Sequence, residues 1–327
     1  NVNAPTITGS QVYVAGELYS WTDTAPIMSA GNVATAMDDI IDSDYDPEFV
    51  HIVGQAASVA DAHTMATLLD GKVQAAWGAH KYFFACFEAP AATTAALAAE
   101  FANFVSIGVV GFGGFAEISN ETNGAVEKMS IGRTLSARIA RNPIEVHVLR
   151  TAGDEDIEAL SDVVKLVPET AVSGDGYHDE DKTPGLNAAR FSTLRTITGR
   201  RGFFPTNALT FADSASDYQS LPYLRIILKV ARVWYQYGLS QLAKRVRKDR
   251  TTGFIQPSFA SAIETKGETA IKRALGGSIE AVRALINRND DLAADPTVRA
   301  SVRVVCGDYI LTLESDVGLA ATLPVAA

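Results

Sequence analysis

The stretch that decides the fold runs from residue 49 to residue 110, where apolar strands alternate with amphipathic helices. Strands are predicted at Phe49–Val53 (FVHIV), Lys81–Phe87 (KYFFACF) and Ile107–Val110 (IGVV). Between them, the apolar spacing predicts helices over Ser58–Trp77 and Thr93–Phe104. Parallel strands are joined by crossover helices and are buried on both faces. The order therefore predicts an α/β fold with a mainly parallel sheet and flanking helices.

The same alternation continues on both sides of this stretch. Residues 31–44 carry an i, i+4, i+7, i+8 apolar stripe that predicts a helix, and residues 131–141 and 145–149 predict a further helix and a strand. We therefore expect an α/β domain over residues 12–167, preceded by an extended N-terminal arm at residues 1–11.

A long-helix C-terminal part is expected after this domain. Residues 168–189 hold Pro, Gly and acids and predict an exposed acidic loop or insertion. Over residues 190–316 the expected elements are a helix from Ser216 or Asp217 to about Arg250 with Pro222 in its first turns, helices over 258–275 and 278–286, and a terminal β-hairpin of Val302–Cys306 and Tyr309–Leu313. Residues 317–327 form an uncharged apolar C-terminal tail.

The composition excludes several classes of protein. Apolar residues make up 47% and charged residues 20%, as in globular proteins. No stretch approaches the roughly 18 uncharged apolar residues of a membrane helix, so no membrane insertion is expected. Cys86 and Cys306 form no CxxC, which excludes a zinc ribbon, an iron–sulfur cluster and a disulfide scaffold. The first residue is Asn rather than Met, which indicates a trimmed or processed chain.

Charge is distributed unevenly along the chain. Residues 1–189 carry 9 Lys/Arg against 26 Asp/Glu, whereas residues 190–250 carry 12 against 3. The basic block could bind nucleic acid, meet the acidic surface of another copy of the chain, or be a solvated helix face without a partner. The acidic surroundings would repel phosphate, which favours another copy over nucleic acid.

One glycine-rich stretch matches a nucleotide-binding pattern. Gly111–Ala116 fits G-x-G-x-x-G/A and follows a predicted strand. A dinucleotide site requires a helix N-terminus next, to hold the pyrophosphate. Glu117–Gly124 is a poor helix former, so we predict a glycine-rich turn and no bound cofactor.

No other motif predicts catalysis or metal binding. The acids around residues 175–181 lack the alternate oxygen ligands of a calcium loop. His51 and His147 lie inside predicted apolar strands, and no HxH, HExxH, GxSxG or phosphate-loop pattern occurs. The sequence therefore predicts no catalytic, cofactor-binding or metal-binding residues, and a protein that is not an enzyme.

The C-terminal part carries a family resemblance. Residues 199–242 (GRRGFFPTNALTFADSASDYQSLPYLRIILKVARVWYQYGLSQL) and 250–264 (RTTGFIQPSFASAIE) resemble the tail sheath-like proteins of contractile phages. The matching positions are Gly199, Arg200, Phe204, Pro205, Ser216, Asp217, Tyr218, Leu224, Arg225, Ala231 and Arg232. Upstream, Phe49–Gly54, Ile131–Arg133 and Ala137-Arg138 fit the same family.

The resemblance implies a structural subunit of a contractile tail sheath. Such a subunit polymerises as stacked rings around an inner tube and contracts to drive the tube into a target cell. The implied partners are other copies of the chain, the inner tail tube protein, and baseplate and tail terminator proteins, with no direct nucleic acid. The implied location is the virion, in the tail sheath, after assembly in the bacterial host cytoplasm. Sheath families also join neighbours by strand exchange between chain termini.

Three groups of residues are candidates for subunit interfaces. The basic run consists of Lys244, Arg245, Arg247, Lys248 and Arg250. Its candidate acidic partner on a neighbour consists of Asp38, Asp39, Asp42, Asp44, Asp46 and Glu48. The two ends of the chain are expected to be ordered by other copies, with Val2, Ile7, Leu319 and Leu323 as candidate contacts.

Other functions remain open at this point. A sheath-related tail connector or terminator protein would share the fold. A nucleotide-binding α/β enzyme would use Gly111–Ala116, and a nucleic-acid-binding module would use Lys244–Arg250.

Overall fold

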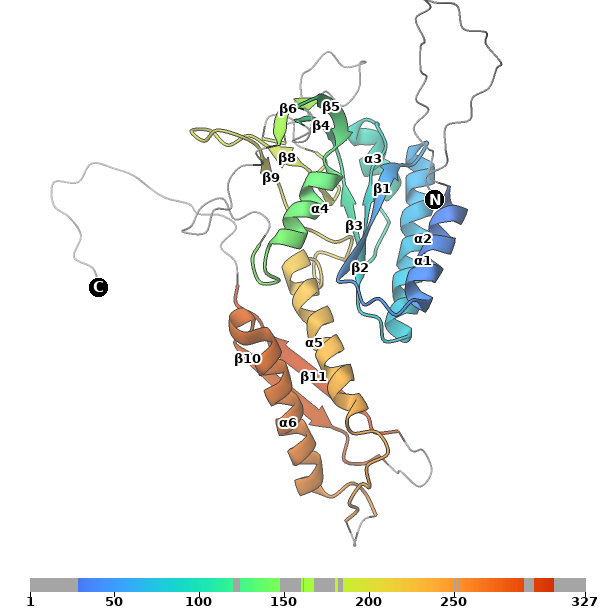
Figure 1. Cartoon of the computed structure of the whole chain (residues 1–327), viewed down its shortest axis with the longest axis vertical. Coiled ribbons are helices and arrows are strands. Elements are labelled where there is room, and N and C mark those ends of the chain that lie inside the picture. The colour runs from blue at the N-terminus through green and yellow to red at the C-terminus, as the bar shows by residue number, and fades with distance from the viewer. Residues whose placement is uncertain are drawn as a thin grey trace, which may run out of the picture.

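The chain has an α/β body and a narrower second part, and one long helix runs from the first into the second (Figure 1). The structure is a computed structural model that describes residues 29–119, 124–147, 160, 162–167, 180–181, 185–249, 251, 253–290 and 297–308. The predictions for the N-terminal arm and for the apolar tail lie outside the described residues.

A four-stranded parallel sheet in the order β1-β2-β3-β7 forms the centre of the body. Its strands are β1 (Phe49–Gln55), β2 (Phe84–Glu88), β3 (Val109–Phe112) and β7 (Phe191–Ser192). One face is covered by α1 (Ala30–Asp42), α2 (Val59–Gly78) and α3 (Thr94–Phe101), and the other by α4 (Gly132–Arg141) and the first half of α5 (Leu221–Leu239). The predicted mainly parallel sheet with flanking helices is confirmed.

The run of apolar residues around β2 is explained by burial on both faces of this sheet. Phe83, Ala85 and Phe87 lie in the core beneath α1, α2 and α3. Phe84 and Cys86 lie in the opposite core, beneath α4 and α5. A strand that is covered on both sides needs no polar alternation, so its sequence is apolar throughout.

Hydroxyl caps fix where the helices begin. The Ser58 hydroxyl accepts a hydrogen bond from the Asp61 N–H at 3.1 Å, at the start of α2. At the start of α3, the Thr93 hydroxyl accepts one from the Ala96 N–H at 3.2 Å. Each bond satisfies one of the N–H groups that a first helical turn leaves unpaired.

Two small antiparallel sheets lie beside the body. They are built from β4 (Phe115–Ser119), β5 (Val126–Ser130) and β6 (Val163–Val167), and from β8 (Leu194–Arg195) and β9 (Phe204–Pro205). The strand order in the larger of the two is β5-β4-β6.

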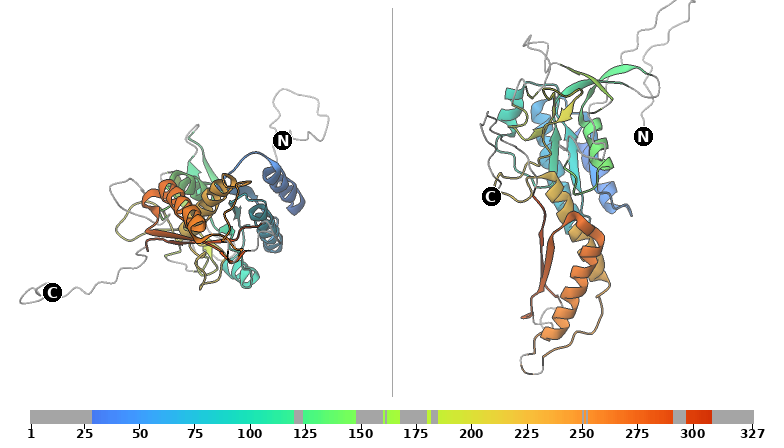
Figure 2. Two further views of the ribbon diagram at one scale, coloured as in Figure 1. Left: turned by 90° about the horizontal axis from the view of Figure 1, so that it is seen from below. Right: turned by 90° about the vertical axis from the view of Figure 1, so that its left-hand side faces the viewer.

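The second part combines two helices with a β-hairpin. Below the body, α5 packs on α6 (Pro257–Leu275), which ends in the short 3₁₀ helix η1 (Gly276–Ser278). The strands β10 (Ala281–Ile286) and β11 (Ala300–Val305) pair antiparallel. Both views in Figure 2 place this hairpin beside α6.

The helix predicted over residues 278–286 is wrong, because this segment is the strand β10. Gly276, at φ 54°, ends α6 before it. Val282, Ala284 and Ile286 are buried and the residues between them are exposed, which is the period of two of a half-buried strand. A β-hairpin is present as predicted, but β11 pairs with β10. The strand predicted at Tyr309–Leu313 lies outside the described residues.

The long helix also ends earlier than predicted. Rather than reaching Arg250, α5 stops at Leu239, directly after Gly238, a residue that is unfavourable in helix interiors. Ala243 then has a φ of 60°, which a continuing helix does not allow. Leu239 and Leu242, which end and follow this helix, are exposed.

Two further predictions need correction. The described part of the strand predicted at 145–149 is a turn, in which the Val146 N–H donates to the Pro143 carbonyl at 3.1 Å. The described part of the predicted acidic loop is not fully exposed. Glu180 is buried and accepts from the Gly185 N–H at 2.7 Å, and Leu186 packs into the core of the body.

Candidate assembly surfaces

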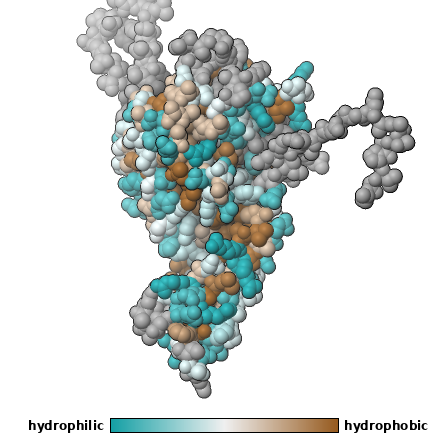
Figure 3. Space-filling view, turned by 180° about the vertical axis from the view of Figure 1, so that it is seen from behind, coloured by the Kyte–Doolittle hydropathy of each residue, from teal (hydrophilic) through white to brown (hydrophobic). Residues whose placement is uncertain are grey.

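The β10–β11 hairpin has one covered face and one exposed face. On the covered face, Val282, Val302 and Val304 pack with Ile271 and Leu275 of α6. The residues between them in both strands point to the other side, away from α6, and are exposed. Figure 3, which views the molecule from behind, shows apolar and hydrophilic residues side by side over this lower part.

The free edge of β10 is capped by two carboxylates of α6. The Ala284 N–H donates to Glu268 Oε1 at 2.9 Å, and the Ile286 N–H donates to Glu264 Oε1 at 2.8 Å. Glu264 is itself buried and pairs with Arg288 at 3.1 Å. Because these N–H groups are already bonded, another strand could add to β10 only by displacing both glutamates.

The free edge of β11 is open along the described chain. Val302 and Val304 are paired with Ala284 and Val282. Because Ala284 directs its N–H away from β11, the register also directs the N–H groups of Val302 and Val304 away from β10. Among the described residues no acceptor bonds to either group. An open edge of this kind is a template for an added strand.

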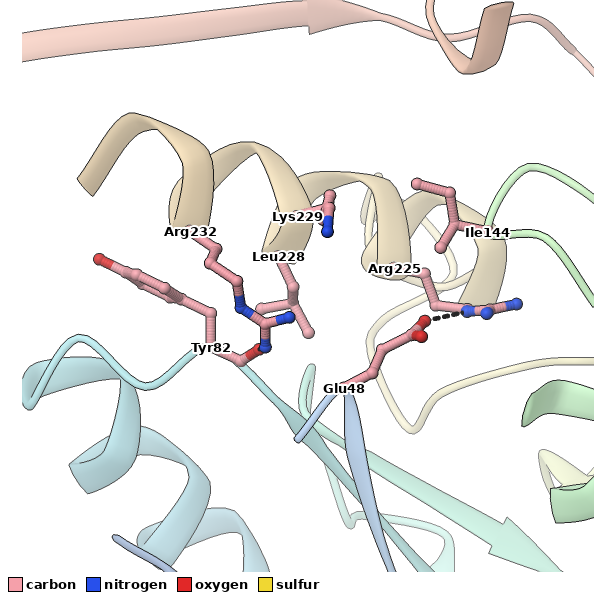
Figure 4. A pocket seen from close by; sticks show the side chains of 7 residues that line it. All are labelled: Glu48, Tyr82, Ile144, Arg225, Leu228, Lys229 and Arg232. Atoms are coloured by element: carbon pink, nitrogen blue, oxygen red, sulfur yellow. Dashed lines mark hydrogen bonds and ion pairs between the residues drawn. The ribbon is translucent and has the colours of Figure 1, made fainter. Parts of the chain in front are cut away.

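The joint between the body and α5 is held by two arginines (Figure 4). Arg225, which is 2% exposed, donates through Nε to Glu48 Oε1 at 2.5 Å and through Nη2 to the Asn142 carbonyl at 3.0 Å. Arg232 lies 2.9 Å from Asp46 and donates to the carbonyls of Pro47 and Tyr82, each at 2.8 Å. The two guanidinium groups thus tie α5 to the segment that enters β1.

A small pocket lies at this joint. Its lining residues are Glu48, Tyr82, Ile144, Arg225, Leu228, Lys229 and Arg232. Burial raises the pKa of the Tyr82 phenol above its ordinary value, and neighbouring Tyr235 raises it further. The charged groups in the pocket are the same ones that hold the joint, so we interpret it as part of the connection between body and helix.

The predicted acidic patch is divided by the fold. Asp38 pairs with Lys72 of α2 at 2.5 Å, and Asp46 and Glu48 are engaged by the two arginines of α5. The other three acids, at the end of α1 and just after it, are Asp39, Asp42 and Asp44. All three are exposed and have no ion pair within the described residues.

The basic run forms a surface loop beyond α5. Lys244, Arg245, Arg247 and Lys248 are exposed, and Lys248 makes an isolated antiparallel bridge with Ile255. Because the helix ends at Leu239, its C-terminal dipole does not act on this run. Arg250 and the terminal candidates Val2, Ile7, Leu319 and Leu323 lie outside the described residues.

The glycine-rich stretch joins two strands. Gly111 lies in β3, and β4 follows after Gly113 and Gly114, so no helix N-terminus stands there for a phosphate. A Cβ atom at Gly111 would lie 2.7 Å from the ring of Phe191. Aromatic packing therefore requires a glycine at position 111, and in place of the predicted turn only Gly113 and Gly114 lie between the two strands.

The described residues form no group of three or more His, Cys, Asp or Glu side chains that could hold a metal ion. His51 lies in β1, 3.3 Å from the buried Glu88. Burial lowers the pKa of His147 to about 4. Along the described chain, none of the helices has both the length and the apolar content needed to cross a membrane.

Sequence reasoning missed the functions of four charged residues. Arg225 and Arg232 were noted as part of a family pattern, and their seven-residue spacing places both on one face of α5. Glu264 and Glu268 are four residues apart on α6, which is the spacing that lets both meet one strand edge. The signal was present, but the strand they cap was itself not predicted.

Comparison with solved structures identifies similar folds. A chain of the anti-feeding prophage baseplate in the contracted state matches with a TM-score of 0.60 at 12% identity, covering 89% of this chain and 76% of that one. A chain of the PVC sheath complex, an extracellular contractile injection system in the contracted state, matches with a TM-score of 0.58 at 14% identity, covering 87% and 75%. For the contracted helical sheath of the anti-feeding prophage the TM-score is 0.52 at 14% identity, covering 89% and 76%. The fold is thus similar to sheath and baseplate components of contractile injection systems.

Comparison at the level of sequence gives one assignment. No curated protein sequence matches the chain. The N-terminal domain of the DUF2586 family matches residues 4–209. This match covers more than half of the chain, including the strands from β1 to β9. The chain therefore belongs to the DUF2586 family.

Proposed function

We propose that this protein is a structural subunit of a contractile tail sheath, in a phage or a related injection particle. It would polymerise as stacked rings around an inner tube and contract to drive the tube into a target cell. Its partners would be other copies of itself, the inner tube protein, and baseplate and tail terminator proteins. The similar folds in sheath complexes support this proposal, and such a role requires no catalytic residue.

The observation that carries the proposal is the hairpin with one closed and one open edge. A subunit that accepts a strand from a neighbour at one defined edge forms a head-to-tail contact, and repeated contacts of this kind generate rings or helices. The donor would be an extended terminal segment of another copy. Residues 2–8, with Val2 and Ile7, and residues 317–327, with Leu319 and Leu323, are the candidates.

Ion pairs between copies would add to this contact. We expect the exposed basic run to face an acidic surface of a neighbouring subunit. Exposed ion pairs contribute only about 0–1 kcal/mol each, so they can be exchanged during contraction while their number supplies the total. A candidate acidic partner is the patch from Asp38 to Glu48, of which Asp39, Asp42 and Asp44 have no ion pair among the described residues.

Reversing two charges of the basic run tests this interface. The double variant Arg245→Glu, Arg247→Glu is expected to raise the protein concentration needed for assembly by about 10-fold at low salt. Both side chains are exposed, so the monomer should unfold at the same temperature as the natural chain. Sedimentation at several salt concentrations measures the effect. Unchanged assembly at low salt would refute the interface.

A sheath-related connector, terminator or baseplate protein is the second candidate. One of the similar structures is a chain of the anti-feeding prophage baseplate, which supports this alternative. Negative-stain electron microscopy of the purified chain separates the possibilities. Long tubes or stacked rings are expected for a sheath subunit, and single rings for a connector. Discrete small particles at all concentrations would contradict both.

A further inference from the structure

Two arginines face each other across the exposed side of the hairpin. Arg283 of β10 is directly opposite Arg303 of β11, and both side chains are exposed. Like charges directly opposite each other destabilise a strand pair. Within the described part of the chain, no carboxylate pairs with either guanidinium. The pair therefore weakens the isolated hairpin, and a carboxylate from outside it would relieve the repulsion.

Apolar side chains flank the arginine pair on the same side of the hairpin. Leu285, opposite Ser301, is 46% exposed, and Val305, opposite Ala281, is 57% exposed. We call the surface of Arg283, Leu285, Arg303 and Val305 the arginine face. Protein interfaces are enriched in arginine, and their buried centres are more apolar than the rest of the surface. This composition therefore fits a contact with another protein surface.

A complementary surface lies at the end of α1. Asp39, Asp42 and Asp44 are exposed and unpaired among the described residues, and Tyr45 beside them is 80% exposed. We call these four residues the acidic corner. Carboxylates match the guanidinium group in geometry as well as charge, and a tyrosine ring can stack on it.

The acidic corner is also held in shape. Lys81 donates hydrogen bonds to the carbonyl oxygens of Ile40, Ser43 and Tyr45, which satisfies the end of α1 and fixes the turn after it. A surface that is ordered before binding loses less entropy when it binds.

We propose that the arginine face of one subunit binds the acidic corner of a second copy. In Figure 1, α5 lies between the hairpin and α1, and the view from below in Figure 2 also separates them. The two surfaces of one chain therefore do not meet, and each must find its partner on another copy. Because the surfaces differ, the contact is head-to-tail and repeats. This inference deepens the proposed function and assigns Asp39, Asp42 and Asp44 to the arginine face rather than to the basic run.

Charge exchange in the full chain tests the assignment. The face variant is Arg283→Glu, Arg303→Glu, and the corner variant is Asp42→Lys, Asp44→Lys. Each variant alone is expected to self-associate at least about 10-fold more weakly than the natural chain in sedimentation velocity at low salt. The four-substitution chain, in which both surfaces are exchanged, should recover association. Adding the corner variant's substitutions to Arg245→Glu, Arg247→Glu should give no recovery.

A single substitution separates binding from folding. Arg303→Glu places opposite charges across the strand pair, so the monomer's unfolding temperature should equal or exceed that of the natural chain while association weakens. The inference would be overturned if association recovered when the corner variant is combined with Arg245→Glu, Arg247→Glu but not when it is combined with the face variant. Association of the face variant as strong as that of the natural chain would also overturn it. A natural chain that shows no self-association would overturn it as well. If the copies associate as described but form neither rings nor tubes, the sheath proposal alone fails.

Discussion

A chain carrying Val304→Pro is expected to stay folded but to lose assembly. The Val304 N–H points away from β10, so proline removes no hydrogen bond of the hairpin. It does remove a donor from the open edge of β11, and its ring occupies space where an added strand would lie. We expect the concentration needed for assembly to rise at least about 10-fold, which corresponds to about 1.4 kcal/mol per contact. Sedimentation and electron microscopy measure the loss.

The cross-strand partner offers a matched control. Val282 faces Val304 in the register, also packs on α6, and directs its N–H to the capped edge of β10. Val282→Pro should therefore leave assembly intact at a similar cost in packing, and Val304→Ala should keep the edge donor and assemble. Loss of tubes with Val282→Pro but not with Val304→Pro would show that the wrong edge was assigned.

The donor side of the same contact can be removed by deleting residues 317–327. These eleven residues carry no charge, and an apolar segment of that length is an aggregation hazard unless it is covered. The shortened chain is expected to give monomers that form no tubes. Normal tubes from the shortened chain would show that the tail is not the donor. Residues 2–8 would then be the remaining candidate.

The second large effect is expected at the joint. Arg225→Met keeps most of the side-chain volume but removes a buried cation, leaving Glu48 and the Asn142 carbonyl without their donor. Hydrogen bonds to charged groups contribute about 1.5–3 kcal/mol, and a broken buried ion pair costs about 3–5 kcal/mol. Because Glu48 is 38% exposed, we expect the free energy of unfolding to fall by about 2–4 kcal/mol. Chemical denaturation at neutral pH measures it.

Two further variants make this test specific. Lys229→Met removes a charge from the same part of α5. The Lys229 ammonium has no partner among the described residues, so the free energy of unfolding should change by no more than about 0.5 kcal/mol. Adding Glu48→Gln to Arg225→Met should cost little more, because the two groups act as a pair. Equal losses for Arg225→Met and Lys229→Met would mean that the joint does not depend on the ion pair.

The elements of the body could be predicted from the sequence because each has one strong periodic signal. The helical spacing of Met65, Leu69 and Val73 on α2 corresponds to their burial. The apolar run at β2 indicates a strand that is buried on both faces. The alternation at Val282, Ala284 and Ile286 has only three buried positions, comes shortly after two glycines, and was mistaken for a helix. The end of α5 depends on a single glycine and a turn, which a periodic pattern does not register.

The assembly surfaces were less predictable, since they depend on contacts between distant segments. The sequence identified the acids from Asp38 to Glu48. In the fold, Lys72, Arg225 and Arg232, which are distant along the chain, pair with Asp38, Glu48 and Asp46. The capping of β10 by Glu264 and Glu268 could be recognised only once β10 was known to be a strand. Charge composition therefore predicted that copies meet, whereas the fold was needed to propose where.

A cryo-electron microscopy map of the assembled chain tests whether copies are joined by a strand added to β11. We expect stacked rings in which an extended segment of another copy lies hydrogen-bonded beside β11, next to Val302 and Val304. In the same map, Glu264 and Glu268 should remain bonded to β10. An assembly with no added strand at β11, or a purified chain that gives only discrete particles, would contradict this expectation.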